Sequence, residues 1–203
     1  MIYLSKRTSA DVYSTIRYEI ITGVISSNEL ILEQAIAQRF EVNRLTAREA
    51  LQRLCTEKYL RSFPRKGYLV TDISADQLRK IQQVRFQIES LAIRLVIENC
   101  TDAEIAQLQD ILKEQGESGD PDQSTTNRFH LRIASLSQNE FIYDALYTYL
   151  GYTTRYAMTA IFTNRFGGYV SYHEQIADAM LRRSTEEAIE WLRKDLLENA
   201  KSL

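Results

Sequence analysis

The chain has 203 residues, 44% of them hydrophobic and 26% charged, which suits a folded, water-soluble protein of two modest domains. No apolar run approaches the roughly 18 residues of a membrane span, and the polar opening 1–6 excludes a signal peptide. Cys55 and Cys100 lack metal-binding spacing, so reduced thiols and a cytoplasmic location are expected.

The formal charge of −2 is unevenly distributed along the chain. Residues 1–72 contain 11 Lys and Arg against 8 Asp and Glu, whereas residues 73–203 contain 14 against 19. A basic N-terminal part on an acidic body favours a polyanionic partner for the first part only.

Three helices are expected at the N-terminal end, over residues 8–23, 33–40 and 44–58. In the first, Val12, Ile16 and Ile20 recur at helical spacing, and Gly23 can end the helix. The second and third are separated only by residues 41–43, and Asn43 is a good N-cap. Residues 59–61 and 68–70 then resemble short strands that flank a basic turn.

The pattern changes after residue 72 to long amphipathic helices without a convincing strand. The expected helices span 75–99, a segment capped by Thr101, 125–136, 140–162, 169–183 and 185–200, with a loop over 116–124. We therefore predict a mainly α protein, in which a winged helix-turn-helix over 1–72 is followed by an all-α six-helix bundle over 73–203.

Two helices joined by a tight turn, the second of which begins with a polar cap and carries basic residues, are typical of a helix-turn-helix. Arg44, Leu45, Thr46 and Arg48 lie in the first turn and a half of that helix, the part nearest to base edges in a major groove. Arg65 and Lys66, in the turn between the strands, can neutralise phosphates.

The segment from Ile36 to Leu54 reads IAQRFEVNRLTAREALQRL, and the segment from Arg65 to Val70 reads RKGYLV. Together with the preceding Ile20-Ile21-Thr22-Gly23, they resemble the GntR family of bacterial regulators, most specifically in Arg48-Glu49-Ala50-Leu51. Asn43 replaces the usual Ser, Leu45-Thr46 replaces Thr-Pro, and Ser26-Ser27-Asn28 replaces a Pro-Gly turn. This resemblance implies double-stranded operator DNA as a partner, contacted by Arg39, Arg44, Arg48, Lys66 and Gly67. Together with the positions considered above, the candidate DNA-binding residues are Arg39, Asn43, Arg44, Leu45, Thr46, Arg48, Arg65, Lys66 and Gly67. Arg53 is assigned instead to a surface salt bridge.

The remainder of the chain resembles the all-helical ligand-binding domain of the FadR/VanR branch of that family. Three segments carry this likeness: 84–92, 129–139 and 173–196. Six helices rather than seven favour the VanR-like group.

Many members of that branch bind a divalent metal through an Asp four residues before a His and through two later His residues. The corresponding positions here are Thr126, His130, His173 and Asp195, so the resemblance implies His130, His173 and Asp195 as ligands of zinc, nickel, manganese or iron. The alternative is core hydrogen bonding of the two histidines without metal.

Arg85 matches an arginine that often faces the central pocket in the family. It could pair with a carboxylate effector, or with Glu89 one helical turn away. The candidate effector-binding residues are Arg85, Thr126 and Arg155. Asn139 is expected to cap the helix over 140–162, and the tyrosines on that helix are expected to belong to the core or to a dimer surface.

The resulting hypothesis is a homodimeric transcriptional regulator, a repressor, whose helical domain binds a small organic acid. One rival is a DNA-binding regulator whose metal-free bundle only dimerises. The other is a metal-dependent enzyme, for which Glu174 beside His173 would be the general base.

Overall fold

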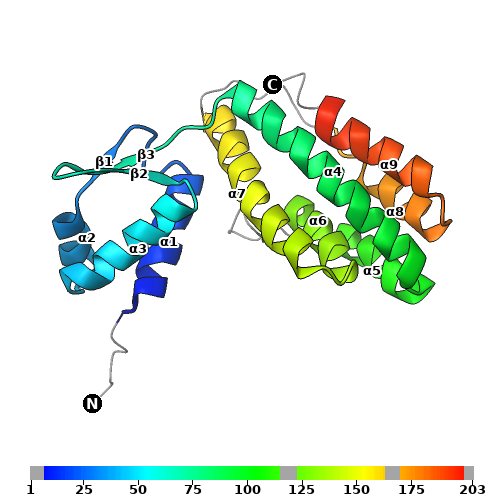
Figure 1. Ribbon diagram of the computed structural model, residues 1–203, viewed down its shortest axis with the longest axis horizontal. Helices are drawn as coiled ribbons and strands as arrows, with labels where there is room; N and C mark the ends of the chain where they lie inside the picture. The colour runs from blue at the N-terminus through cyan, green and yellow to red at the C-terminus, as the bar shows by residue number, and fades with distance from the viewer. Residues whose placement is uncertain (1–6, 115–122, 163–169, 199–203) are drawn as a thin grey trace, which may run out of the picture. The chain divides into compact units, whose positions relative to one another are not determined.

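A computed structural model describes residues 7–114, 123–162 and 170–198. The chain forms two compact units, Met1–Asp72 and Ile73–Leu203 (Figure 1). Cys55, in the first unit, and Cys100, in the second, are both free thiols.

The first unit consists of three helices and a three-stranded antiparallel sheet. The helices are α1 (Ser9–Ile21), α2 (Glu33–Phe40) and α3 (Arg44–Thr56). The strands are β1 (Leu30–Ile31), β2 (Leu60–Phe63) and β3 (Gly67–Val70), and β3 lies in the middle of the sheet. The elements α2 and α3, followed by the β2–β3 hairpin, form the expected winged helix-turn-helix.

Local side chains set the boundaries of α2 and α3. The turn between them contains Glu41 in the left-handed region, with φ 55°, which ends α2. Asn43 then accepts a hydrogen bond from the Thr46 amide through its Oδ1 atom at 2.9 Å, which confirms the expected N-cap of α3. The buried Ala47, Leu51 and Leu54 hold the inner face of α3 in the core.

Strand β1 is absent from the sequence-based expectation. It pairs Leu30 with Leu69 and Ile31 with Tyr68. A strand of two residues is too short for an alternating pattern, and only its partner β3 reveals it.

The second unit contains six α-helices among the described residues, as expected: α4 (Ala75–Asn99), α5 (Asp102–Lys113), α6 (Thr125–Leu136), α7 (Glu140–Phe162), α8 (His173–Leu181) and α9 (Thr185–Arg193). Ser74 and Thr101 form capping boxes at the starts of α4 and α5. Asn139 Oδ1 accepts from the amides of Phe141 and Ile142 and so caps α7, as expected. Most of the expected loop over 116–124 lies outside the described residues.

The last two helices are shorter than expected. Helix α8 begins at His173 instead of residue 169, and Tyr172, whose amide donates to Asp195 Oδ1 at 3.1 Å, is its N-cap residue. Tyr169 lies outside the described residues. Helix α9 ends at Arg193 and is followed directly by a π-helical turn, η2 (Lys194–Glu198), which contains Asp195.

One apolar core fills the second unit, and members of all six helices contribute to it. Its fully buried side chains include Ile93, Leu108, Phe129, Leu146, Ile176 and Leu192. Among the described residues, no helix is both long enough and apolar enough to cross a membrane.

Gly67 is the position in the hairpin that requires glycine. Its φ is +119°, and a Cβ atom there would lie 2.5 Å from the carbonyl oxygen of Ile31 in β1. We expect Gly67→Ala to destabilise the sheet by about 1–3 kcal/mol or more, because backbone strain and a steric clash act together. Hydrogen–deuterium exchange of the full chain should show faster exchange over 60–70. Lys66→Ala, at an exposed position of the same turn, is the control, and unchanged exchange in Gly67→Ala would contradict this account.

Candidate functional site

The first turn of α3 presents a small polar and apolar surface to solvent. Arg44 and Arg48 are exposed, and Leu45 between them is 62% exposed. The Arg44 Nη2 atom donates to Gln34 Oε1 on α2 at 3.0 Å. Thr46 is half-buried, and its amide donates to the Asn43 cap. These side chains project from a helix whose opposite face lies in the core, as required of a helix that enters a groove.

Arg48 is held by a carboxylate from the preceding helix. Its Nε and Nη2 atoms donate to Glu33 Oε1 and Oε2, each at 3.0 Å. The Tyr68 hydroxyl of β3 donates to the same Glu33 Oε1 at 2.8 Å. Hydrogen bonds from Arg48, opposed by partial burial and reinforced by Tyr68, lower the pKa of Glu33. Glu33 thus links α2, α3 and β3.

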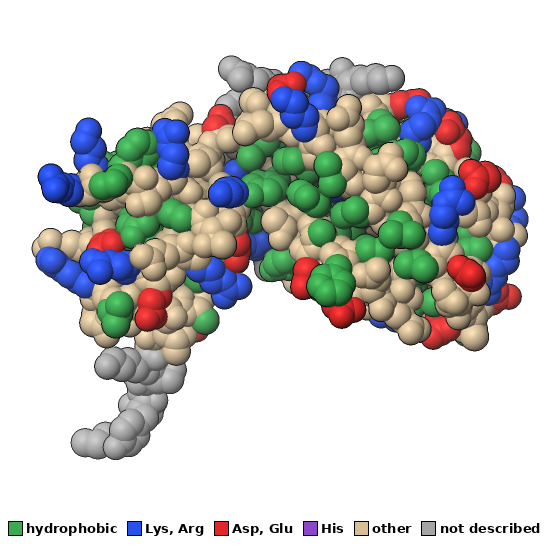
Figure 2. All heavy atoms as spheres, in the orientation of Figure 1, with side chains coloured by type: hydrophobic (Ala, Val, Ile, Leu, Met, Phe, Trp, Pro, Cys, Tyr) green, Lys and Arg blue, Asp and Glu red, His purple; other side chains and the backbone are tan. Residues whose placement is uncertain are grey.

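The hairpin after α3 carries exposed cations at its tip. The Lys66 amide donates to the carbonyl of Phe63 at 3.0 Å and closes the turn, and Arg65 takes a left-handed conformation with φ 64°. Arg65 and Lys66 are exposed. Figure 2 shows Lys and Arg side chains gathered around this end of the first unit.

The other two arginines considered at the sequence level are also paired. The Arg39 Nη1 atom donates to Glu19 Oε2 on α1 at 2.7 Å, and its Nη2 atom donates to Oε1. Arg53 pairs with Glu57 at 3.1 Å and lies over the ring of Tyr13, so the expected surface salt bridge is present.

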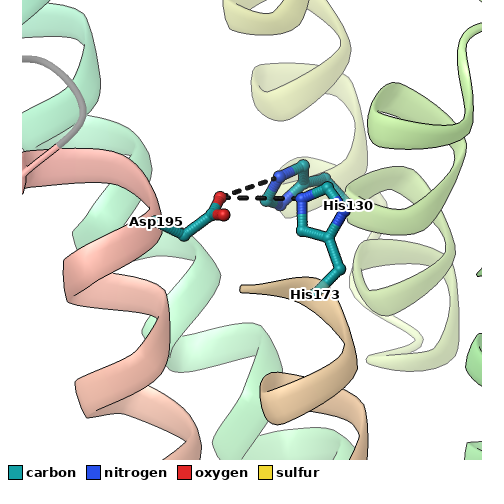
Figure 3. A group of neighbouring side chains, drawn as sticks. All are labelled: His130, His173 and Asp195. Carbon is teal, nitrogen blue, oxygen red and sulfur yellow. Dashed lines mark ion pairs between the residues drawn. The ribbon is translucent and has the colours of Figure 1, made fainter. Parts of the chain in front are cut away.

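In the second unit the structure brings together His130, His173 and Asp195 (Figure 3). They come from α6, from the first residue of α8 and from η2, and all three are buried. The Asp195 Oδ2 atom lies 3.6 Å from the Nε2 atom of each histidine. One possible ligand atom from each residue lies within 4.8 Å of the others.

Neighbouring groups hold His130, His173 and Asp195 in place. The His130 Nδ1 atom lies 2.5 Å from Glu89 Oε2 on α4, and the ring of Phe129 stacks on His173 with centroids 4.5 Å apart. The Tyr172 amide holds Asp195 Oδ1, and the Tyr172 ring stacks on Trp191 at 5.5 Å. Rotation of each of the three side chains is therefore restricted.

The Glu89 carboxylate is shared between His130 and Arg85. Arg85 donates through Nε to Glu89 Oε1 at 2.9 Å and through Nη1 to Gln82 Oε1 at 3.1 Å. The expected pair of Arg85 with Glu89 is therefore present. The Arg85 Nη2 atom is buried without a hydrogen-bond partner among the described residues. That nitrogen can still donate to an incoming acceptor.

The charges of the buried group follow from these contacts. Burial raises the pKa of Asp195, but the contacts with His130 and His173 outweigh burial and hold it well below its usual value. Burial lowers the pKa of His130, yet the neighbouring charge of Glu89 and the contact with Asp195 raise it overall. Burial dominates at His173 and lowers its pKa. The two histidines are therefore shifted in opposite directions, although both lie beside the same carboxylate.

These residues fit a divalent metal. Two ligand atoms bound to one ion at about 2.0–2.2 Å lie no more than about 4.4 Å apart. The 3.6 Å separations at Asp195 meet that limit, whereas the three-atom group as a whole is bounded by 4.8 Å. The carboxylate of Glu89 on the far nitrogen of His130 is the outer contact that metal-bound histidines usually make.

The remaining candidates lie on α6, α7 and α8. Thr126 is half-buried on α6, four residues before His130 and so on the same face of the helix. Arg155 is buried on α7, with its guanidinium 5.7 Å from the centre of the Tyr152 ring. Glu174 is exposed whereas the adjacent His173 is buried, so the general base that the enzyme hypothesis needs does not face the site.

Sequence reasoning did not identify Glu33 as a functional residue, and it connected Glu89 only with Arg85. Glu33 and Arg48 are 15 residues apart, and Glu89 and His130 are 41 apart. No periodic pattern links positions at these separations, so only the packing of α2 on α3 and of α4 on α6 reveals the pairs.

Two known families match the chain. The family described as "Bacterial regulatory proteins, gntR family" matches residues 8–70, and the FCD domain matches residues 80–197. The Nta operon transcriptional regulator of Aminobacter aminovorans is 39% identical over 116 residues, which cover 55% of each chain. The gluconate operon transcriptional repressor of Bacillus subtilis is 30% identical over 112 residues, which cover 55% of this chain and 46% of the repressor. The matches thus span about half the length of these curated relatives.

Solved structures with the same fold include Escherichia coli McbR/YncC and a GntR regulator from Rhodococcus sp. RHA1. The first superposes with a TM-score of 0.67 at 21% identity, over 98% of this chain and 96% of the other. The second has a TM-score of 0.71 at 23% identity, over 95% of each chain. At these identities the likeness concerns the fold alone.

Glu89 should be essential to the stability of the second unit. We expect Glu89→Gln to lower the free energy of unfolding by about 3–5 kcal/mol, because Arg85 is left buried beside a neutral amide. The control is Glu186→Gln, which removes the exposed partner of Arg94 on the same helix α4 and should cost about 0–1 kcal/mol. Urea unfolding followed by far-ultraviolet circular dichroism measures both. Equal losses in the two variants would contradict this role of Glu89.

Proposed function

Since the chain belongs to the GntR family of bacterial regulators, with a GntR domain followed by an FCD domain, we propose that it is a transcriptional repressor controlled by a small organic acid. The N-terminal unit binds operator DNA in the cytoplasm, and the C-terminal unit binds the effector. The carrying observation is the α2–turn–α3 element, because the start of α3 exposes Arg44, Leu45 and Arg48 above a buried inner face.

The proposed DNA contacts divide into two classes. Arg44, Leu45, Thr46 and Arg48 approach base edges in the major groove, where arginine recognises guanine and an apolar side chain fits the thymine methyl group. Asn43, Arg39, Arg65, Lys66 and the backbone of Gly67 contact the phosphates that set register and orientation. Exposure of the hairpin cations supports the second class.

We propose a homodimer that binds a pseudo-palindromic operator with two α3 helices. The second unit exposes large apolar side chains on two neighbouring helices: Val84 and Leu91 on α4, and Phe141, Tyr143 and Tyr147 on α7. Figure 2 shows hydrophobic side chains gathered over these helices. An apolar surface of this kind on a charged protein supports association of two copies.

The effector site is proposed to lie at the buried group of α6, α8 and η2. His130, His173 and Asp195 would hold a divalent metal such as zinc, nickel, manganese or iron, which would supply a positive charge and open coordination positions. A carboxylate could then pair with the Arg85 Nη2 atom, and Thr126 and Arg155 are proposed as further contacts. To regulate, the effector must favour one arrangement of the dimer by roughly 1–3 kcal/mol.

The second candidate is a repressor whose bundle dimerises without metal. It is favoured by Thr126, which provides no carboxylate at the position where the metal-binding members have an aspartate. The six helices of the bundle support assignment to the VanR-like group.

The DNA-binding proposal predicts different effects for the two classes of contact. We expect the full chain to select a sequence from random duplexes, and Arg48→Ala to lose about 1–3 kcal/mol of discrimination at one base pair. Arg65→Ala should weaken binding to all duplexes and reduce the salt slope by about 1. Arg53→Ala is the control, since Arg53 pairs with Glu57 and lies over the Tyr13 ring and is not proposed as a DNA contact. Fluorescence anisotropy at several salt concentrations measures these effects, and failure to select any sequence would contradict the proposal.

The metal proposal predicts that the protein, once stripped of metal by a chelator, binds one divalent ion per chain. We expect Glu89→Gln to reduce affinity about 10- to 100-fold, and His130→Ala, His173→Ala and Asp195→Asn to reduce it further. Asp178→Asn, at an exposed position of α8, should have no effect. Calorimetric titration with zinc, nickel and manganese measures these affinities, and the absence of stoichiometric binding would favour the metal-free alternative.

The same preparations extend this test to the effector. Mono- and dicarboxylic acids should raise the melting temperature of the metal-loaded wild-type protein. The shift should disappear in Arg85→Met if that arginine binds the carboxylate. A shift of equal size in Arg85→Met would remove Arg85 from the effector site.

A further inference from the structure

The Glu33–Arg48 pair uses one particular edge of the guanidinium group. The Nε–H and one Nη2–H point to the two oxygens of Glu33, both at 3.0 Å. A guanidinium carries five N–H groups in one plane. The two Nη1–H groups and the second Nη2–H therefore remain, and they include the end-on edge formed by Nη1 and Nη2.

That remaining edge matches a guanine. The major-groove side of guanine offers two acceptors, O6 and N7, and a bidentate arginine is the commonest specific contact to them. An arginine whose other edge is fixed by a carboxylate can still make this contact. Its side chain also loses less rotational freedom on binding, because the pair with Glu33 has already ordered it.

Glu33 is itself fixed in place. It is the first residue of α2, its side chain is only 25% exposed, and its Oε1 atom accepts from the Tyr68 hydroxyl at 2.8 Å. Tyr68 is buried in the central strand of the sheet. The carboxylate therefore ties Arg48 to helix α2 and to strand β3.

The Arg48 pair also differs electrostatically from its neighbours. Arg44 contacts the neutral Gln34, so its positive charge is not compensated by that partner. Arg48 shares its charge with Glu33, which weakens its attraction to a phosphate while leaving directional donors for a base. Of the two arginines, Arg48 is therefore the one whose pairing favours a base over a phosphate.

From this geometry we propose that Glu33 is a positioning residue that presents the end-on edge of Arg48 to a guanine and makes Arg48 a base-reading rather than a phosphate-binding residue. The inference rests on the proposed DNA-binding function. The competing interpretation is that Glu33 only masks Arg48 in the free protein and releases it to the DNA backbone.

The test uses the full chain and duplexes that the wild-type protein selects from a random library. In the selected site, each guanine is replaced in turn by 7-deazaguanine, which lacks the N7 acceptor, and binding is measured at several salt concentrations. We expect one guanine per half-site whose replacement weakens wild-type binding about 5- to 150-fold, the range for a bidentate arginine contact.

Glu33→Gln should abolish most of this preference while binding to unrelated duplexes becomes stronger and its salt slope increases by about 1, because Arg48 is released to phosphates. A variant that merely unfolds would lose both kinds of binding. Glu49→Gln, an exposed charge-matched control on α3, should strengthen binding to all duplexes and keep the preference. Arg48→Lys should lose the preference but retain binding to unrelated duplexes, since lysine has the charge without the planar edge.

Two results would overturn the positioning role alone: an unchanged preference in Glu33→Gln with stronger binding to every duplex, or an unchanged preference in Arg48→Lys. Either result would leave the regulator function intact, because the wild-type protein still selects its site. A wild-type protein that selects no sequence would instead remove the proposed function, and this inference with it.

Discussion

A carboxylate buried in a helical core needs positive partners, and Glu89 has two. Arg85 contacts one of its oxygens and His130 contacts the other, so the ion pair on α4 is continuous with the histidines on α6 and α8 and with Asp195 on η2. Each of these groups is nearly inaccessible to water. In a medium of low dielectric constant, removal of one member leaves the others uncompensated. The architecture of the second unit therefore depends on the integrity of a charged network at its centre, where a purely structural core would use apolar packing.

The first unit uses the same chemistry closer to solvent. Glu33 lies between Arg48 and Tyr68 much as Glu89 lies between Arg85 and His130. In each case a carboxylate on an earlier helix orients a functional group on a later one. The environments differ. The Glu33 pair is half exposed and adds little to stability, so its effect falls on orientation. The Glu89 pair is fully buried, so orientation and stability cannot be separated there.

Much of the fold and part of the candidate site could be predicted from the sequence. Hydrophobic periodicity and caps placed α2, α3 and α4 within a few residues, and Asn43 caps α3 as expected. The resemblance to a known family singled out His130, His173 and Asp195, which the structure brings together. Strand β1, the late start of α8, the role of Glu33 and the contact of Glu89 with His130 could not be predicted. They depend on pairings between distant segments, for which a single sequence carries no periodic signal.

The ring of Trp191 packs on Tyr172, whose backbone amide binds Asp195. Trp191 is the single tryptophan of the chain. Its fluorescence therefore comes from a ring that contacts Tyr172, the residue directly before His173. The N-terminal unit contributes no indole signal. The protein thus carries an intrinsic optical reporter that separates events in the helical bundle from events at the DNA-binding unit, without a label or an engineered probe.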